Sequence, residues 1–381
     1  MRYILFFLVL FFCLSCETES VDNDQNDNND QNDNNDQNDN NDNSDNTAEE
    51  DQITIEDGIQ DLLDCIAALE SGDFSDLVID IYDNVDGDNS DFHEIMAEAV
   101  EDIPNFQPLL DSDYPEVPLN MSNYFGEYTY NSQNQLWSTL NSNSEIRMSF
   151  PMFTNSNSND TFISFSNFNE ELMPIEDPIY IPTSLSMNMV HDDESMFSLN
   201  IINVDYSMSG EIPIPNDVNF SIYMNPFTHD FSIDKLSDDD FKLIYSLSNN
   251  FGCITEIDAR VKLLSTDYEN LEDTDIDFIQ IEFKTNNLLF DINVDAEYLF
   301  ALDDPSVIQI NNFIDIEVFS ENTLLGEIQI QEDSNEDYYL NMVFIDGTVV
   351  NVEEFSGIGI DADDFIQTIE GIFARYTNRF D

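Results

Sequence analysis

Basic residues are scarce in this chain: 9 Lys and Arg stand against 81 Asp and Glu in 381 residues, for a formal net charge of −72 at pH 7. So negative a field repels nucleic acid and anionic membrane surfaces, and it favours cations and basic partners. The composition therefore argues against nucleic acid as a partner. Many of the acids are also expected to serve only as solvated surface.

Residues and motifs that carry common catalytic chemistry are equally few. The three histidines, His93, His191 and His229, stand in unrelated contexts, and the sequence has no Cys-x-x-Cys, His-Glu-x-x-His, Gly-x-Ser-x-Gly or phosphate-binding glycine loop. Carboxylate pairs of the kind that hydrolyse glycosides are uninformative, because 81 acids make some suitable pair nearly certain. The sequence predicts a protein that is not an enzyme and identifies no catalytic residue.

The first sixteen residues have the layout of an export signal. Arg2 supplies a positive start, residues 4–12 form an apolar run too short to cross a bilayer, and Leu14-Ser15-Cys16 ends it. This junction resembles the lipobox of bacterial lipoproteins, where signal peptidase II cleaves before a cysteine that is then acylated. The resemblance implies a signal peptide over 1–15, lipidation at Cys16 and a membrane anchor. Cys13 departs from the usual leucine, which leaves cleavage elsewhere by the ordinary signal peptidase as the alternative.

Residues 16–50 read as a disordered tether. The unit Asp-Gln-Asn-Asp-Asn-Asn occurs three times between Asp24 and Asn41, and no apolar residue falls between Val21 and Ala48 to repay the entropy of ordering. A flexible chain of 30 residues spans roughly 30 Å. The acids directly after Cys16 resemble the signal that sends Bacteroidota-type lipoproteins to the cell surface, which implies a surface-facing outer-membrane lipoprotein. Alternatively, these acids simply begin the tether.

A helical segment and connector are expected over 51–122. Apolar residues recur at helical spacing before Gly72, at Ile55, Ile59, Leu62, Leu63, Ile66 and Leu69. Shorter helices are expected at 74–82 and at 91–102, the latter ending at Pro104. A last apolar stripe predicts a C-terminal helix over 361–381 that packs on the rest; it contains Phe365, Ile366, Ile369, Ile372, Phe373 and Tyr376.

Between about 123 and 360 the apolar period is two. Phe290, Ile292 and Val294 alternate with polar residues, and the same pattern recurs in many other segments, which is typical of antiparallel strands with one dry face. The parity slips at Ile201 and Ile202, which predicts a bulge. The fold class is therefore mainly β (α+β): a large curved antiparallel sheet or half-open barrel with N-terminal helices and a C-terminal amphipathic helix.

Two groups of residues are candidates for a metal site and a disulfide. Asp83, Asp86, Asp88 and Asp91 surround Gly87 in a stretch that can wrap Ca²⁺, the one cofactor the sequence offers, although it fails the EF-hand spacing and a plain polar loop explains it as well. Once Cys13 and Cys16 are assigned to the export signal, Cys65 and Cys253 remain. They form either a disulfide or buried free thiols.

The segment with the single tryptophan reads as a hairpin. Residues 126–131 and 135–137 place Trp137 across from a tyrosine, as core packing or as a ligand contact. Together with Ile146-Arg147-Met148-Ser149-Phe150-Pro151 and Ile181-Pro182-Thr183-Ser184-Leu185, this hairpin resembles uncharacterised Bacteroidota-type surface lipoproteins over about residues 123–250. The resemblance implies the compartment and the β architecture and brings no activity.

The combined reading is a cell-envelope lipoprotein with a non-catalytic binding or scaffold role. One version holds a lipid or other apolar ligand against its 30 Phe and 12 Met, which are equally an ordinary core. The alternatives are a Ca²⁺-dependent surface adhesin or nutrient-capture component, and an envelope hydrolase. The expected partners are the membrane, through the lipid anchor, and an unknown envelope partner or apolar ligand.

Overall fold

The computed structural model describes residues 47–70, 72–74, 77, 95, 99, 103 and 117–352, except 143, 154–157, 176–177, 211, 303–309 and 333–337. The predicted signal peptide, Cys16, the Asp83–Asp91 loop and the C-terminal helix lie outside these residues, as do most of the two short helices expected at 74–82 and 91–102. So does the tether predicted over 16–50 up to residue 46, whereas its residues 48–50 belong to the first helix. No helix within the described ranges is long and apolar enough to span a membrane.

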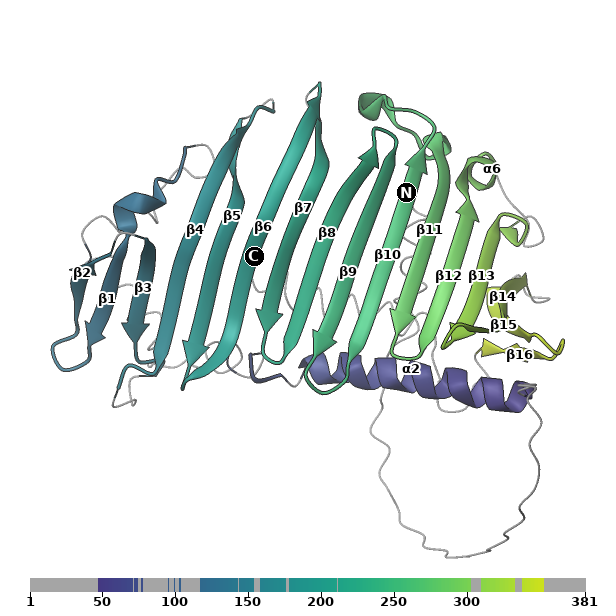
Figure 1. The fold of residues 1–381 in the computed structure, drawn as a ribbon, viewed down its shortest axis with the longest axis horizontal. Coiled ribbons are helices and arrows are strands. Elements are labelled where there is room, and N and C mark those ends of the chain that lie inside the picture. The colour runs from purple at the N-terminus through teal and green to yellow at the C-terminus, as the bar shows by residue number, and fades with distance from the viewer. Residues whose placement is uncertain are drawn as a thin grey trace, which may run out of the picture.

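The sixteen strands of the described chain form one open sheet, confirming the predicted large antiparallel architecture (Figure 1). Each strand pairs with its neighbour in sequence, except that β1 lies between β2 and β3 and runs parallel to β3. The sheet is open, with β16 at one edge and β2 at the other. Its strand order is β16-β15-β14-β13-β12-β11-β10-β9-β8-β7-β6-β5-β4-β3-β1-β2.

The strands differ in length, and β4–β7, with 13 to 16 residues each, are the longest. In chain order they are β1 (Gly126–Asn131), β2 (Leu136–Asn141), β3 (Glu145–Phe150), β4 (Thr161–Met173), β5 (Ile179–His191), β6 (Glu194–Ser209), β7 (Ile212–Met224), β8 (Phe227–Ser237), β9 (Asp240–Asn249), β10 (Ile254–Leu263), β11 (Ile276–Thr285), β12 (Leu288–Asp295), β13 (Ile314–Ser320), β14 (Thr323–Glu332), β15 (Tyr338–Phe344) and β16 (Val349–Asn351). The helices are α2 (Ala48–Glu70) and α6 (Ala296–Phe300), with short 3₁₀ turns at Met121–Tyr124, Tyr268–Asn270 and Asp273–Asp275.

Tight turns keep consecutive strands adjacent. Asp192 and Asp193, between β5 and β6, have φ of 49° and 65°, and Glu321 and Asn322, between β13 and β14, have φ of 47° and 72°. Two successive residues in the left-handed region form the kind of two-residue turn whose twist matches that of the paired strands. Local turn chemistry therefore favours the meander order.

The period-two pattern places apolar side chains on one face, as predicted. Phe290, Ile292 and Val294 of β12 are buried, whereas Asn293 between them is exposed. The predicted bulge is also present: Ile201 pairs with Phe220 and Asn203 pairs with Asn219, so Ile202 has no partner on β7 and is 63% exposed. The extra residue returns the apolar parity of β6 to the same face of the sheet.

Helix α2 begins at Ala48, three residues before the helical segment expected from residue 51, because a capping box opens it. The Thr47 backbone N–H donates to Glu50 Oε2 at 3.2 Å, and the Glu50 N–H donates back to Thr47 Oγ1 at 3.4 Å. From there Ile55, Ile59 and Leu62 turn toward the sheet and are at most 5% exposed.

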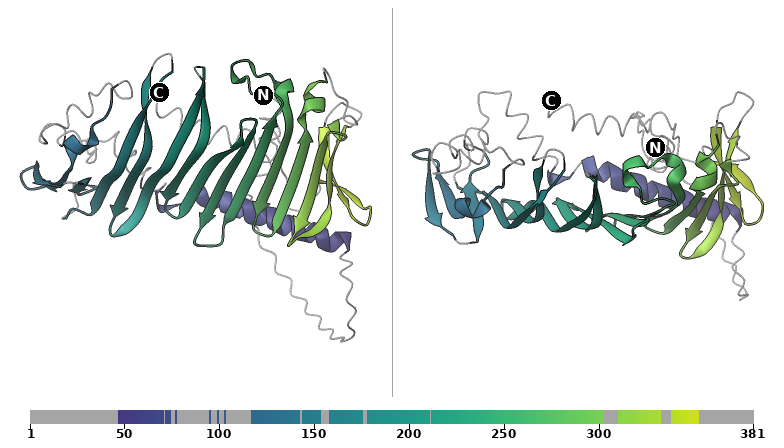
Figure 2. Two further views of the ribbon diagram at one scale, coloured as in Figure 1. Left: turned by 45° about the horizontal axis from the view of Figure 1, so that its top comes forward. Right: turned by 90° about the horizontal axis from the view of Figure 1, so that it is seen from above.

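Helix α2 crosses the ends of the strands instead of running along them, and it lies beside one face of the sheet only (Figures 1 and 2). Gly58 lies against Leu288, and Asn286 Nδ2 donates to Asp61 Oδ2 at 3.0 Å, both at the β11–β12 turn. Seven residues later Cys65 forms a disulfide with Cys253 at the β9–β10 turn. Seven residues advance a helix by about 10.5 Å, close to the roughly 9.6 Å that separates every second strand, so the helix meets successive hairpins in step.

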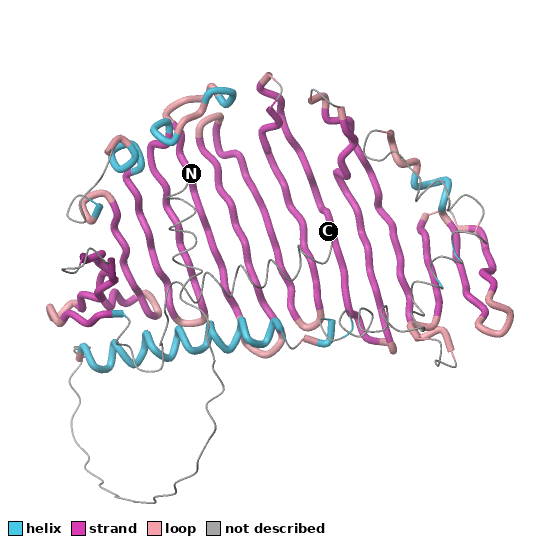
Figure 3. The backbone as a smooth tube through the Cα atoms, turned by 180° about the vertical axis from the view of Figure 1, so that it is seen from behind, coloured by secondary structure: helices cyan, strands magenta, loops and turns pink. Residues whose placement is uncertain are grey.

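Two hydrophobic clusters lie on the same face of the sheet, one toward each end. The first joins α2 to β10–β16 and includes Phe283, Leu288 and Val318. The second lies over β1–β5 and includes Trp137, Phe150 and Ile163, together with Ile95 and Ala99. Figure 3 shows the long strands of the middle of the sheet between these two ends.

We expect loss of the disulfide to destabilise the sheet, because it joins residues 188 positions apart. Cys65→Ala and Cys253→Ala should each lower the free energy of unfolding by about 2–5 kcal/mol in urea denaturation. The double variant should be no worse than either single one, and a reductant should bring the unsubstituted protein to the same level. If the double variant lost the sum of the two single losses in unfolding free energy, the two cysteines would not share a bond.

We expect Gly58→Ala to destabilise the protein, although alanine is the better helix former by about 1 kcal/mol. A Cβ atom at Gly58 would press on the Cγ and Cδ1 of Leu288, whose side chain is 1% exposed, and such overpacking costs about 1–3 kcal/mol. In a Leu288→Ala background the same substitution should stabilise. If Gly58→Ala changed the free energy of unfolding in the same direction in both backgrounds, α2 would not pack against Leu288.

Candidate functional site

The middle of the sheet carries an apolar surface that continues the buried face of both clusters. Register places Ile201, Phe220 and Phe231 in one row across β6, β7 and β8, and Val204, Val218 and Ile233 in the next row. We call these six residues the central apolar face: Ile201, Val204, Val218, Phe220, Phe231 and Ile233.

The central apolar face is only half-buried. All six side chains are of intermediate exposure, whereas their neighbours in the same row on β10, β11 and β12 (Ile257, Phe283 and Phe290) are at most 7% exposed. Phe220 and Phe231 stack with ring centroids 4.8 Å apart, which makes a continuous aromatic surface. Within the described chain, the rows stay apolar from strand to strand, and only the exposure of their side chains changes.

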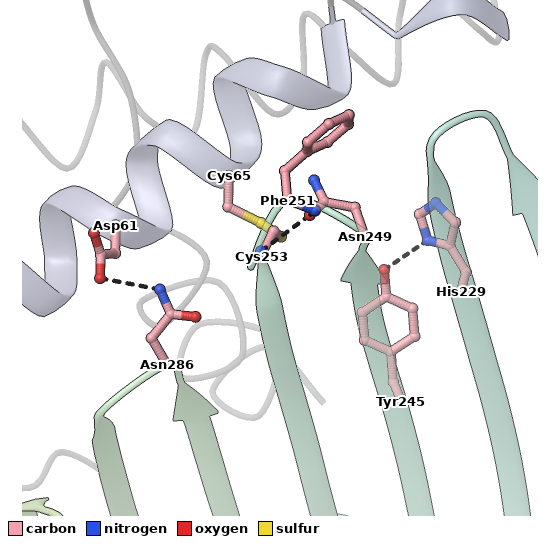
Figure 4. Close-up of a disulfide and its surroundings, with 8 residues drawn as sticks. All are labelled: Asp61, Cys65, His229, Tyr245, Asn249, Phe251, Cys253 and Asn286. Atoms are coloured by element: carbon pink, nitrogen blue, oxygen red, sulfur yellow. Dashed lines mark hydrogen bonds between the residues drawn. A yellow bond between two sulfur atoms is a disulfide. The ribbon is translucent and has the colours of Figure 1, made fainter.

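A polar pair interrupts this apolar side of the sheet beside the disulfide (Figure 4). His229 Nδ1 and the Tyr245 hydroxyl share a hydrogen bond of 2.9 Å, close to the cluster of Cys65, Phe227, Leu247 and Cys253. Burial lowers the pKa of His229, partly offset by Asp230, and burial raises the pKa of Tyr245 to about 12. His229 Nε2 is buried and meets no hydrogen-bond partner among the described residues.

The opposite face of the sheet is polar, and it holds most of the few cations. Arg260 donates to both carboxylate oxygens of Asp240 at 2.9 and 2.6 Å, Lys242 Nζ lies 2.7 Å from Asp258, and Lys262 Nζ lies 2.7 Å from Asp239. Hydrogen bonding to Arg260 lowers the pKa of Asp240, and hydrogen bonding to Lys262 lowers the pKa of Asp239. These pairs neutralise acids on adjacent strands that would otherwise repel one another.

Further along the polar face, acids oppose acids. Register aligns one acid from each of β10–β14 in a row: Asp258, Glu282, Asp291, Glu317 and Glu327. Burial raises the pKa of Glu317, and the negative charges of Asp315, Asp291 and Glu327 raise it further. A row of acids alone does not define a metal site, and we assign it no ion.

One group in the described part of the chain brings three possible metal-ligating residues together. Asp160, His191 and Asp192 each offer one atom within 4.8 Å of the others. His191 Nδ1 lies 2.9 Å from Thr161 Oγ1 and 3.8 Å from Asp160 Oδ1, whereas Nε2 lies 3.8 Å from Asp192 Oδ2. The two acids lie near different ring nitrogens, and Nδ1 already has Thr161 Oγ1 as its hydrogen-bond partner, so we assign this group no ion.

The structure accounts for several of the residues singled out in the sequence. Cys65 and Cys253, for which the sequence left two states open, form a disulfide. Trp137 lies across from Tyr130 on the β1–β2 hairpin, is 8% exposed and donates through Nε1 to the Ile95 carbonyl at 3.1 Å, so it packs in the core. The Asp83, Asp86, Asp88 and Asp91 candidate and the lipidation site Cys16 lie outside the described residues.

Sequence reasoning missed both His229–Tyr245 and the group around His191, because their members come from different strands. Comparison of the chain with protein-family models, with curated proteins and with solved structures finds no match. Function must therefore be argued from the surfaces of the sheet.

We expect His229 to make the protein less stable as the pH falls. Because its pKa is lowered in the fold, the unfolded chain takes up the extra proton below about pH 6.5, and stability decreases from there downward. The unfolding free energy of His229→Gln relative to the unsubstituted protein should rise between about pH 7.5 and 5.5 in urea denaturation. Thr228→Gln on the same strand should show a difference that does not vary with pH, and equal pH profiles for both variants would refute this role of His229.

Proposed function

We propose that this protein is a lipid-anchored component of the cell envelope, facing outward, with a non-catalytic binding role. In this proposal its binding surface is the central apolar face, and its ligand is an acyl chain. The single observation that carries the proposal is the half-buried apolar surface on β6–β8 between two covered clusters. Support for the anchor comes from the lipobox-like Leu14-Ser15-Cys16.

The shape of this surface suits a narrow, apolar ligand. The two rows of the central apolar face lie two residues apart on β7 and β8, which is about 7 Å at 3.3 Å per residue. The apolar side chains form successive rows along that direction, each three strands or roughly 10 Å wide. An extended acyl chain fits such a strip and gains free energy in proportion to the apolar area that it buries.

The net charge of the chain limits which lipid headgroups the proposed ligand can have. A net charge of −72 raises the energy of any anion near the protein, so a free fatty acid or an acidic phospholipid meets repulsion. The proposed ligand is therefore an acyl lipid with a neutral or zwitterionic headgroup. It would also be present in the membrane to which the lipidated cysteine anchors the protein.

The proposal predicts that Phe231→Asp weakens acyl binding. The test uses residues 17–381 and a neutral fluorescent monoacylglycerol, followed by fluorescence anisotropy. Removing one phenyl ring from the contact should raise the Kd by about tenfold, since such a contact is worth on the order of 1.4 kcal/mol.

Ser232→Asp is the matched control, because Ser232 is the next residue on β8 and faces the opposite side of the sheet. It adds the same charge and should leave the Kd unchanged, and thermal denaturation should show both variants folded. Absence of binding by the unsubstituted protein, or an equal loss in the two variants, would overturn the proposed ligand or its site.

A further inference from the structure

The polar pair of His229 and Tyr245 lies at one end of the central apolar face (Figure 4). On β8, His229 precedes Phe231 by two residues, so the two side chains lie on the same side of the sheet, about 7 Å apart along the strand. Tyr245 on β9 is the register partner of Phe231 and continues its row. A ligand that covers Phe231 therefore lies directly beside a hydroxyl and an imidazole.

Two buried polar atoms in the row of His229 have no hydrogen-bond partner among the described residues. They are His229 Nε2 and Thr255 Oγ1. Register pairs both residues with Leu247, from β8 on one side and from β10 on the other, so they flank a single apolar side chain. A buried polar atom without a partner costs free energy, and native structures contain few of them. Two such atoms in one row indicate a place that a ligand with hydrogen-bonding groups completes.

The hydrogen bond between His229 and Tyr245 determines what Nε2 can bind. Burial lowers the pKa of His229, so the imidazole is mainly neutral at pH 7 and carries one N–H. If the Tyr245 hydroxyl donates to Nδ1, Nε2 is a donor; if Nδ1–H donates to the hydroxyl oxygen, Nε2 is an acceptor. A hydroxyl group of a ligand both donates and accepts, so it satisfies Nε2 in either tautomer. A carbonyl oxygen satisfies only the first.

We infer that His229, held by Tyr245, binds a hydroxyl group in the headgroup of the ligand. The inference deepens the proposed function, on which it rests for the acyl chain, and it narrows the ligand to a neutral acyl lipid with a free hydroxyl. The acyl chain then runs from His229 over Phe231 and Ile233. Because Nε2 is covered in this structure, contact with the ligand requires a local shift of the ring or of its neighbours.

The polarity of β8 gives the ligand this direction. At the opposite end of the strip, beyond Ile233, Lys235 Nζ lies 2.8 Å from the carboxylate of Asp238, which is 81% exposed. Water reaches that ion pair, so it needs no ligand. The unpaired and buried polar atoms are at the His229 end, which is where a headgroup hydroxyl replaces a missing partner.

Two fluorescent probes with the same acyl chain test this subsite: a monoacylglycerol, and the methyl ester that lacks the glycerol hydroxyls. The measured quantity is the ratio of their Kd values for residues 17–381, from fluorescence anisotropy. His229→Leu should reduce the preference for the monoacylglycerol by about fivefold, which is the contribution of one neutral hydrogen bond. Phe231→Leu is the matched control, because it removes apolar contact from both probes and should leave the ratio unchanged.

Nitrogen NMR of isotope-labelled histidine gives a second readout on the unsubstituted protein, which needs no folded variant of His229. The chain has three histidines, and His93→Gln and His191→Gln assign their signals. Monoacylglycerol should shift the ring signals of His229 and leave those of His191 in place, and the methyl ester should shift His229 less.

The outcomes separate this inference from the proposed function. Equal loss of affinity for both probes in His229→Leu, or His229 signals that stay in place while monoacylglycerol is bound, would overturn the subsite and leave acyl binding standing. A water molecule would then be the partner of Nε2. If neither probe binds the unsubstituted protein, the proposed function is wrong, and the subsite is wrong with it.

Discussion

The rest of this structure depends on a single constraint, which is that a sixteen-strand open sheet with one apolar face must have that face covered. Register aligns apolar residues into rows that cross strand after strand, from Ile201 on β6 to Val318 on β13. Removing such rows from water is the main source of stability available to a sheet with few other layers. Each end of the sheet has its own cover, and the middle remains half-buried.

Helix α2 shows how one element covers many strands. By crossing the hairpin turns it contacts a new hairpin about every seven residues, so 23 residues serve the whole end of the sheet from β9 to β16. The disulfide fixes this register at Cys65, and the absence of a side chain at Gly58 allows the close approach at Leu288. The same economy leaves the central strands to another partner, which the proposed ligand would supply.

Charge is organised around this division. Among the described residues, the apolar face carries the His229 imidazole, and burial lowers its pKa, which favours the neutral form. The opposite face carries acids, which are neutralised where Lys242, Arg260 and Lys262 meet them and remain opposed to one another from β11 to β14. A protein with so strong a negative field suits neutral or cationic partners, which is the reason for proposing a neutral lipid.

Local patterns in the sequence determined a large part of the fold. Period-two alternation identified the strands and the face that each one buries, the parity slip at Ile201 and Ile202 identified the bulge, and the helical stripe at Ile55–Leu62 identified α2. These features depend on neighbours within a few residues, which is why a single sequence reveals them. The Thr47–Glu50 capping box is equally local, because its two residues lie three positions apart.

Only the tertiary structure decided what the strands and helices do together. The direction of α2 across the hairpins, the pairing of Cys65 with Cys253 over 188 residues, and the meeting of His229 with Tyr245 all join segments whose separation carries no periodic signal. The same holds for the central apolar face. Its residues have the alternation of any buried strand, and they differ only in which other parts of the chain reach them. Apolar patterning is a local property of the sequence, whereas the covering of an apolar row depends on the whole fold.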